Sequence, residues 1–111
     1  MKIDIRQNQG VTILAPKGRI TIGEGDVALR QAVHEALKAG NSKLLIDMSE
    51  VKTIDSSGIG ELVSAFTTVT NRGGKLKLLN LPAKVNDILQ ITQLITVFDV
   101  FDNEAEAVAS F

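Results

Sequence analysis

One short stretch of the chain gathers side chains that could do chemistry. Residues 55–60 read Asp-Ser-Ser-Gly-Ile-Gly, and the apolar spacing after them predicts a helix that starts near Ser57. Two hydroxyl groups and a carboxylate therefore lie at a strand-to-helix junction. Asp55 or Ser56 can cap this helix by accepting hydrogen bonds from free backbone N–H groups. Alternatively, a serine here can be phosphorylated, because a phosphate at a helix N-terminus meets unpaired N–H groups and the positive end of the helix dipole.

Other chemistries match the sequence less well. Gly58 and Gly60 lack the third glycine of a dinucleotide-binding fingerprint, and no Gly-Lys-Ser/Thr phosphate loop is present. Asp47 and Asp55 could pair as in a response-regulator phosphoacceptor site, but the further acids and the lysine of such a site are missing. Asp47 is therefore expected in a turn or cap. His34, the sole histidine, falls in a charged helical stripe and is expected to be solvated, so we predict no enzyme activity.

Composition limits the class of protein. The chain has 111 residues, of which 44% are hydrophobic, and this length predicts one domain over residues 1–111. A net charge of −1 without a basic cluster argues against nucleic acid as a partner. The absence of cysteine, with one histidine, excludes disulfides and predicts no metal site and no cofactor. No apolar run approaches the ~18 residues of a membrane span. We therefore expect a cytoplasmic protein without membrane insertion.

Hydrophobic periodicity predicts the elements of the N-terminal half. Residues 3–6 alternate as a half-exposed strand does, and a turn over residues 7–10 leads to a second, antiparallel strand at 11–15. A helix follows that ends at Gly40, with a buried stripe of apolar side chains at Leu29, Val33, Ala36 and Leu37.

The start of that helix is open to two interpretations. Thr21 precedes Glu24 by three residues, which is the spacing of a capping box, although Asp26 could equally be the N-cap residue.

The second half predicts alternating strands and helices. Residues 43–47 form a continuous apolar run typical of a central strand, and residues 76–79 are predicted as another strand. Pro82 suits the first position of a third helix. A short strand is expected within residues 97–100, and Asp102 is expected to cap a terminal helix that ends at Phe111. Residues 85–111 contain no Lys or Arg, so this part should present an acidic face.

This order predicts the fold class. It is an α/β fold with a mixed, mostly parallel sheet of four to five strands, an antiparallel N-terminal edge and about four helices.

The motif also resembles a known family. The strand 44–48, the segment 51–54 and the Asp-Ser-Ser-Gly-Ile-Gly motif are similar to the STAS domain of bacterial anti-sigma factor antagonists, or anti-anti-sigma factors. The glycines at 18 and 73–74 and the spacing of Pro82 to Phe98 resemble that family as well, so nearly all of the chain is covered.

The resemblance implies a phosphorylation switch in partner switching and transcription regulation. In such proteins an anti-sigma factor that is also a serine kinase, with a histidine-kinase-like ATPase fold, phosphorylates one serine of the motif. Ser57 matches that acceptor, with Ser56 as the alternative. The unphosphorylated antagonist binds the anti-sigma factor, the phosphorylated form does not, and a metal-dependent serine phosphatase resets the switch.

The same resemblance predicts a partner-binding surface around the motif. Many relatives carry an acidic residue where this chain has Thr21, so Glu24 or Asp26 can supply that carboxylate instead. The expected partner-binding residues are Thr21, Glu24, Asp26, Asp55, Ser56, Ser57, Gly58, Ile59 and Glu61. The alternative function is a STAS adaptor subunit of a signalling or lipid-transport complex without sigma-factor regulation.

Overall fold

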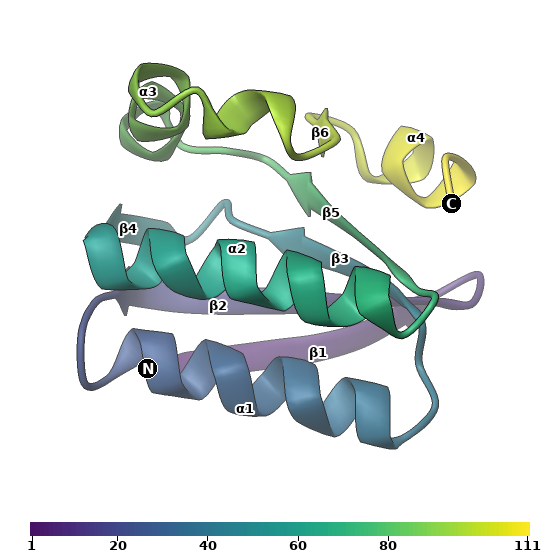
Figure 1. The fold of residues 1–111 in the computed structure, drawn as a ribbon. Helices are drawn as coiled ribbons and strands as arrows, with labels where there is room; N and C mark the ends of the chain where they lie inside the picture. The colour runs from purple at the N-terminus through teal and green to yellow at the C-terminus, as the bar shows by residue number, and fades with distance from the viewer.

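The predicted alternation of strands and helices folds into a six-stranded sheet with helices on both faces (Figure 1). The computed structural model describes residues 1–111. Its strands are β1 (Lys2–Asn8), β2 (Val11–Ile20), β3 (Lys43–Asp47), β4 (Val51–Ile54), β5 (Lys75–Leu79) and β6 (Val100–Phe101). Its helices are α1 (Gly25–Lys38), α2 (Ser56–Asn71), α3 (Ala83–Ile91), the short 3-10 helix η1 (Leu94–Thr96) and α4 (Glu104–Ala109).

The sheet confirms the expected mostly parallel architecture with an antiparallel N-terminal edge. Its order is β1-β2-β3-β5-β6, with β4 also paired to β2, and only the β1–β2 pair is antiparallel. The turn between β1 and β2 is Gln9–Gly10, where both residues have positive φ. Tight two-residue hairpins require this conformation because it follows the strand twist.

Strand β4 is the element that the sequence did not predict. With it the sheet has six strands, whereas four to five were expected. β2 is long enough to pair with β3 through residues 12–14 and with β4 through residues 18–20. The register shifts within the second pairing, so that Gly18 faces Val51 and Arg19 faces Thr53. Lys52 is the extra residue of this bulge, which breaks the alternation that marks a strand.

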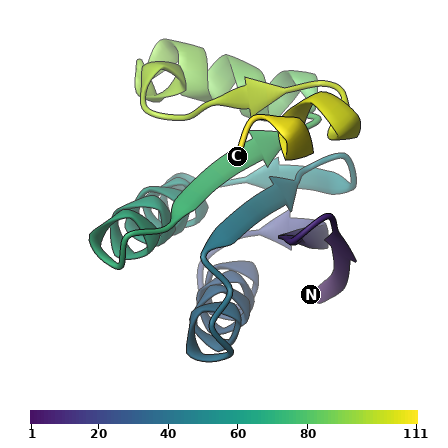
Figure 2. The same ribbon diagram turned by 90° about the vertical axis from the view of Figure 1, so that its right-hand side faces the viewer.

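Two apolar clusters hold the layers together. The larger cluster joins α1, α2 and α3 to one sheet face and includes Leu29, Leu62 and Leu89. The smaller one lies between α4 and the opposite face and includes Val108 and Leu45. Figure 2 shows this division, with α1 and α2 on one side of the sheet and the C-terminal helix on the other. None of the helices has the length and apolar content that a membrane crossing requires.

Several helix ends differ from the predicted ones. α1 begins at Gly25 after Glu24, and no side chain caps it, so neither the capping box nor an Asp26 cap is present. The Thr21 carbonyl instead accepts from the backbone N–H groups of Glu24 and Asp26 and closes a turn there.

The C-terminal elements are shifted by a few residues. Pro82 precedes α3 as its N-cap residue, and Asn103 rather than Asp102 caps α4 through Glu106 N–H. β6 begins only at Val100, and α4 ends at Ala109 rather than at Phe111.

Candidate functional site

The Asp-Ser-Ser-Gly motif lies where four elements meet. The C-terminal ends of β2 and β4 lie beside the N-termini of α1 and α2, and we call this region the site corner (Figure 1). Two glycines allow the helices to approach β2. A Cβ atom on Gly25 would lie 2.0 Å from the Arg19 carbonyl oxygen, and one on Gly58 would lie 2.1 Å from the Ile20 carbonyl oxygen. Any other residue at these positions would force the backbone apart.

Asp55 fixes the backbone of the site corner. Its Oδ1 accepts from Gly58 N–H at 2.9 Å and caps α2, while its Oδ2 accepts from Ile22 N–H at 3.0 Å in the loop before α1. The hydrogen bonds from Gly58 and then from Ile22 hold the pKa of Asp55 below its ordinary value. Asp55 is therefore an anionic clamp that joins the loop to the helix.

The two serines begin α2 immediately after this clamp. Ser56 is exposed and Ser57 is half-buried, and neither hydroxyl group makes a hydrogen bond. Of the two predicted capping residues, Asp55 caps the helix and Ser56 does not. The site corner thus combines a fixed backbone with two hydroxyl groups that make no hydrogen bond within the protein.

The other predicted partner-binding residues divide into two groups. Thr21 and Glu24 are accessible, and the Glu24 carboxylate lies 3.4 Å from the amino group of Met1. The remaining four residues are buried at the base of the corner: Asp26, Gly58, Ile59 and Glu61. The accessible surface is therefore smaller than the predicted one.

Sequence reasoning missed two residues at this corner. Ile22 is 73% exposed although it is apolar, and its backbone is held by Asp55. An isoleucine within the loop sequence Thr-Ile-Gly-Glu was the only signal for it. Arg30 of α1 binds Glu61 of α2 through two guanidinium nitrogens, with Nη2 3.1 Å from Oε2. That contact depends on how the helices pack, so the sequence gives no sign of it.

Asp47 belongs to a second polar cluster, at the carboxyl end of β3. Its carboxylate accepts from Ser49 N–H at 3.1 Å, as a turn residue does, and from the side chains of Arg6 and Asn80. Arg6 also binds Glu104 at the start of α4. We call this group the α4 corner. Asp47 therefore does not pair with Asp55. Burial tends to raise the pKa of Asp47, but the hydrogen bonds outweigh burial, so this pKa lies below its ordinary value.

Two other features bear on the chemistry of the chain. His34 is exposed on α1, as predicted. No group of three or more His, Cys, Asp or Glu side chains is placed to hold a metal ion.

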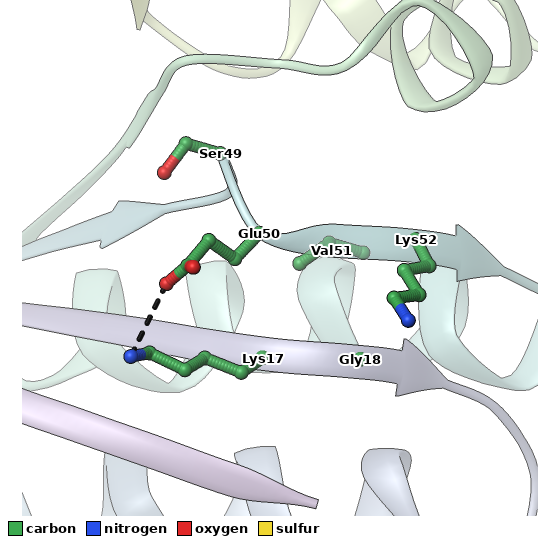
Figure 3. A pocket seen from close by; sticks show the side chains of 6 residues that line it. All are labelled: Lys17, Gly18, Ser49, Glu50, Val51 and Lys52. Atoms are coloured by element: carbon green, nitrogen blue, oxygen red, sulfur yellow. Dashed lines mark ion pairs between the residues drawn. The ribbon is translucent and has the colours of Figure 1, made fainter.

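A hollow of about 520 Å³ lies between β2 and β4, on the face away from α1 and α2 (Figure 3). There Lys17 and Glu50 point toward each other at 3.3 Å, and the motif serines do not line it.

Comparison with known proteins decides the family. The STAS domain model matches residues 2–107. The chain belongs to the STAS domain family. The anti-sigma-B factor antagonist of Bacillus subtilis is 30% identical to this STAS domain over 100 residues, covering 90% of both chains. The relatives of this STAS domain are thus named as antagonists of anti-sigma factors, which are regulatory proteins.

Solved structures agree on the fold. The crystal structure of a candidate anti-sigma factor antagonist from Thermotoga maritima has a TM-score of 0.89 at 26% identity, covering 97% of this STAS domain and 92% of that chain. SpoIIAA, from Bacillus, covers 98% of this STAS domain in both forms. The TM-score is 0.72 for the unphosphorylated form, at 14% identity and 96% of that chain. It is 0.75 for the phosphorylated form, at 16% identity and 98% of that chain.

Proposed function

We propose that this STAS domain is an anti-sigma factor antagonist whose partner binding is switched by phosphorylation of Ser57. The partner is an anti-sigma factor with serine kinase activity and a histidine-kinase-like ATPase fold. The unmodified domain binds it through the accessible part of the site corner, formed by Thr21, Ile22, Glu24, Ser56 and Ser57. Phosphorylation releases it, and a metal-dependent serine phosphatase restores the binding form.

One observation carries the proposal. Ser57 is half-buried and its hydroxyl makes no hydrogen bond, on a backbone that Asp55 and Gly58 hold in place. An acceptor of a phosphoryl group must reach a partner's active site without losing an internal contact, and Ser57 meets this condition. Ser56 has the same free hydroxyl, so it is the alternative acceptor.

Phosphorylation transfers the γ-phosphoryl group of ATP to Ser57. The Ser57 Oγ attacks the γ-phosphorus of ATP, the bond from that phosphorus to the bridging oxygen of ADP breaks, and ADP leaves. The hydroxyl proton passes to a base of the kinase or to solvent. The domain is the substrate in this step, and the kinase supplies the nucleotide site.

The added charge explains why binding is lost. A phosphate carries about −1.5 to −2 charges at pH 7, and it must lose water when the partner covers the corner. Asp55 lies two residues away with its carboxylate ionised, so like charge adds to the desolvation cost. Ile22 contributes apolar contact in the unmodified complex, since 73% of it is accessible to a partner.

The first test is phosphopeptide mapping after incubation with ATP and serine kinases of this fold from the same genome. We expect label on Ser57, with Ser57→Ala abolishing it. Ser64→Ala is the matched control, because Ser64 is exposed on the same helix about two turns later, and it should leave labelling intact. If the label is found on Ser56 alone, then Ser56 and not Ser57 is the phosphate acceptor. No label with any such kinase would favour the adaptor function instead.

The second test is titration calorimetry with the kinase that labels the protein. Ser57→Ala should keep its affinity within about threefold, while Ser57→Asp should weaken binding at least tenfold, which is about 1.4 kcal/mol. Ser64→Asp adds the same charge outside the corner and should bind normally. Ile22→Ser should also weaken binding without changing the fold. Equal affinities for the two Ser57 variants would remove Ser57 from the interface.

A further inference from the structure

In the ion pair between Arg30 and Glu61, the two side chains differ in their exposure to solvent. Arg30 reaches across from α1 so that its Nε lies 3.3 and 3.2 Å from the two carboxylate oxygens of Glu61, and its Nη2 lies 3.1 Å from Oε2. The Glu61 side chain is only 10% exposed, whereas the Arg30 side chain is 51% exposed. The carboxylate is therefore covered, and part of the guanidinium faces solvent.

The exposed part of Arg30 has unused donors. A guanidinium carries five N–H donors in a fixed fork, and Nε and Nη2 are the nitrogens that hold Glu61. Nη1 makes no hydrogen bond. Glu61 and, more weakly, Asp26 raise the pKa of Arg30, so the side chain stays cationic at any ordinary pH.

Ser57 lies on the same side of α2 as this guanidinium. Ser57 and Glu61 are four residues apart in one helix, and such residues are neighbours on a helix face with Cβ atoms about 5–6 Å apart. α1 and α2 lie side by side and start at the same corner (Figure 1). A group added to the Ser57 hydroxyl is therefore one helical turn from the carboxylate that Arg30 binds.

A cation near this position would stabilise the phosphate dianion. The acidic groups of the corner are Asp55 beside the motif, Asp26 in α1, Glu24 in the preceding loop and Glu61 in α2. The positive groups are the guanidinium groups of Arg30 and of Arg19 at the end of β2, and the Met1 amino group, which is paired with Glu24. Arg19 lies on the strand, whereas Arg30 is already fixed to the helix that carries Ser57. Arginine is well suited to bind two anions at once, because its fork has two edges.

We propose that Arg30 binds the phosphoryl group of phosphorylated Ser57 through Nη1, while Nε and Nη2 keep Glu61. The inference rests on the proposed function only in taking Ser57 as the acceptor. In the unmodified protein the Nη1 edge of Arg30 is free for a partner. The phosphate occupies that edge, so modification removes a cationic contact from the surface as well as adding negative charge.

The test measures the second pKa of the phosphate by ³¹P NMR on protein with phosphoserine incorporated at position 57 during translation. This route needs no kinase. Arg30→Gln alone would leave Glu61 buried without a cation, so the comparison uses Glu61→Gln with and without Arg30→Gln. A nearby cation favours the dianion, and loss of Arg30 is expected to raise that pKa by about 0.5 pH unit or more.

Arg72→Gln in the Glu61→Gln background is the matched control, because Arg72 follows the other end of α2. It should shift the titration by less than about 0.1 pH unit, since screening limits charge effects at such a distance. Equal titrations for the Arg30 and Arg72 variants would overturn the role of Arg30 and leave the proposed function intact. Failure of every kinase to label Ser57 would instead overturn the proposed function, while the titration would still decide the inference.

Discussion

Asp47 and Asp55 lie at the carboxyl ends of two strands that both pair with β2, but their carboxylates bind different kinds of group. Asp47 at the α4 corner binds two side chains and one backbone N–H group, and the network continues through Arg6 to α4. Asp55 at the site corner binds only backbone N–H groups. Both carboxyl groups have a lowered pKa, so that property does not separate them.

What separates the corners is the state of the polar groups around each aspartate. At the α4 corner the side chains of Asp47, Arg6 and Glu104 are all hydrogen-bonded, and the contact of Arg6 with Glu104 joins α4 to the sheet. At the site corner the backbone is fixed by Asp55 and by two close-packed glycines, and the serine hydroxyls are left over. Free polar side chains on a fixed backbone are therefore the better sign of an interaction site in this molecule. The predictions below test that distinction.

The largest effect is expected from Gly58→Ala, which breaks the close packing of the site corner. The added Cβ would lie 2.1 Å from the Ile20 carbonyl oxygen, so α2 must move away from β2. Overpacking of this kind costs about 3 kcal/mol of unfolding free energy, which urea denaturation can measure. Gly60→Ala is the control, because nothing lies within 4 Å of its Cβ. It should stabilise the helix by about 0.5–1 kcal/mol, and equal stability of the two variants would contradict the packing argument.

The next effect concerns the α4 corner. Asp47→Ala removes the partner of Ser49 N–H, Arg6 and Asn80 from a site where the side chain is 10% exposed. We expect a loss of about 2 kcal/mol in unfolding free energy, with unchanged affinity for the kinase. Glu50→Ala, at a neighbouring side chain that is 59% exposed, should change stability by less than about 0.5 kcal/mol. Loss of kinase binding at normal stability would show that the corners are not distinct.

Acid should loosen the α4 corner before the site corner. At the α4 corner two carboxyl groups have a lowered pKa, Glu104 through hydrogen bonds from Arg6 and then Asn8, and Asp47, whereas at the site corner Asp55 alone has one. Groups with a depressed folded pKa stabilise above their unfolded values near pH 4, and the contribution is lost as pH falls through the folded values. Amide hydrogen exchange should therefore be constant from pH 7 to 5 after correction for intrinsic rates, and below about pH 4 α4 should open before α2. Earlier opening of α2 would reverse the assignment.

The smallest effect is expected from phosphorylation of Ser57 on stability. Negative charge at a helix N-terminus is favourable by roughly 0.3–1 kcal/mol, and repulsion from Asp55 offsets part of it. About 1 kcal/mol moves the melting temperature of a domain of this size by about 4–8 °C, so calorimetry should find the two forms within a few degrees. Amide shift changes should centre on residues 55–61. Widespread changes in β3 and β5 would mean that phosphorylation alters the fold.

Much of this architecture could be predicted from the sequence because its elements follow clear periodicities. The central strand 43–47 and the helix after Asp55 are confirmed, and the hairpin turn predicted over residues 7–10 is present but confined to Gln9–Gly10. β4 could not be predicted, since the bulge at Lys52 separates its buried residues Val51 and Ile54 by three positions instead of two.

The candidate site could be predicted only in part for a similar reason. The motif itself is local, so residues 55–57 and the start of the helix that follows could be predicted from the sequence. Ile22 and Arg30 enter the corner only through the packing of a loop and two helices. Likewise, Asn103 rather than Asp102 caps α4 because the turn geometry, and not the residue type, selects between neighbours.

The double pairing of β2 has a consequence for how the chain folds during synthesis. β2 is already complete at Ile20, but its two parallel partners end only at Asp47 and Ile54. At roughly 5–20 residues per second, the ribosome leaves the apolar strand without its partners for a few seconds. Such non-local pairing slows folding, and the β1 hairpin covers only one edge of β2 in that interval. A chaperone that binds nascent chains should therefore contact residues 11–15 most strongly until β3, which pairs with residues 12–14, has emerged.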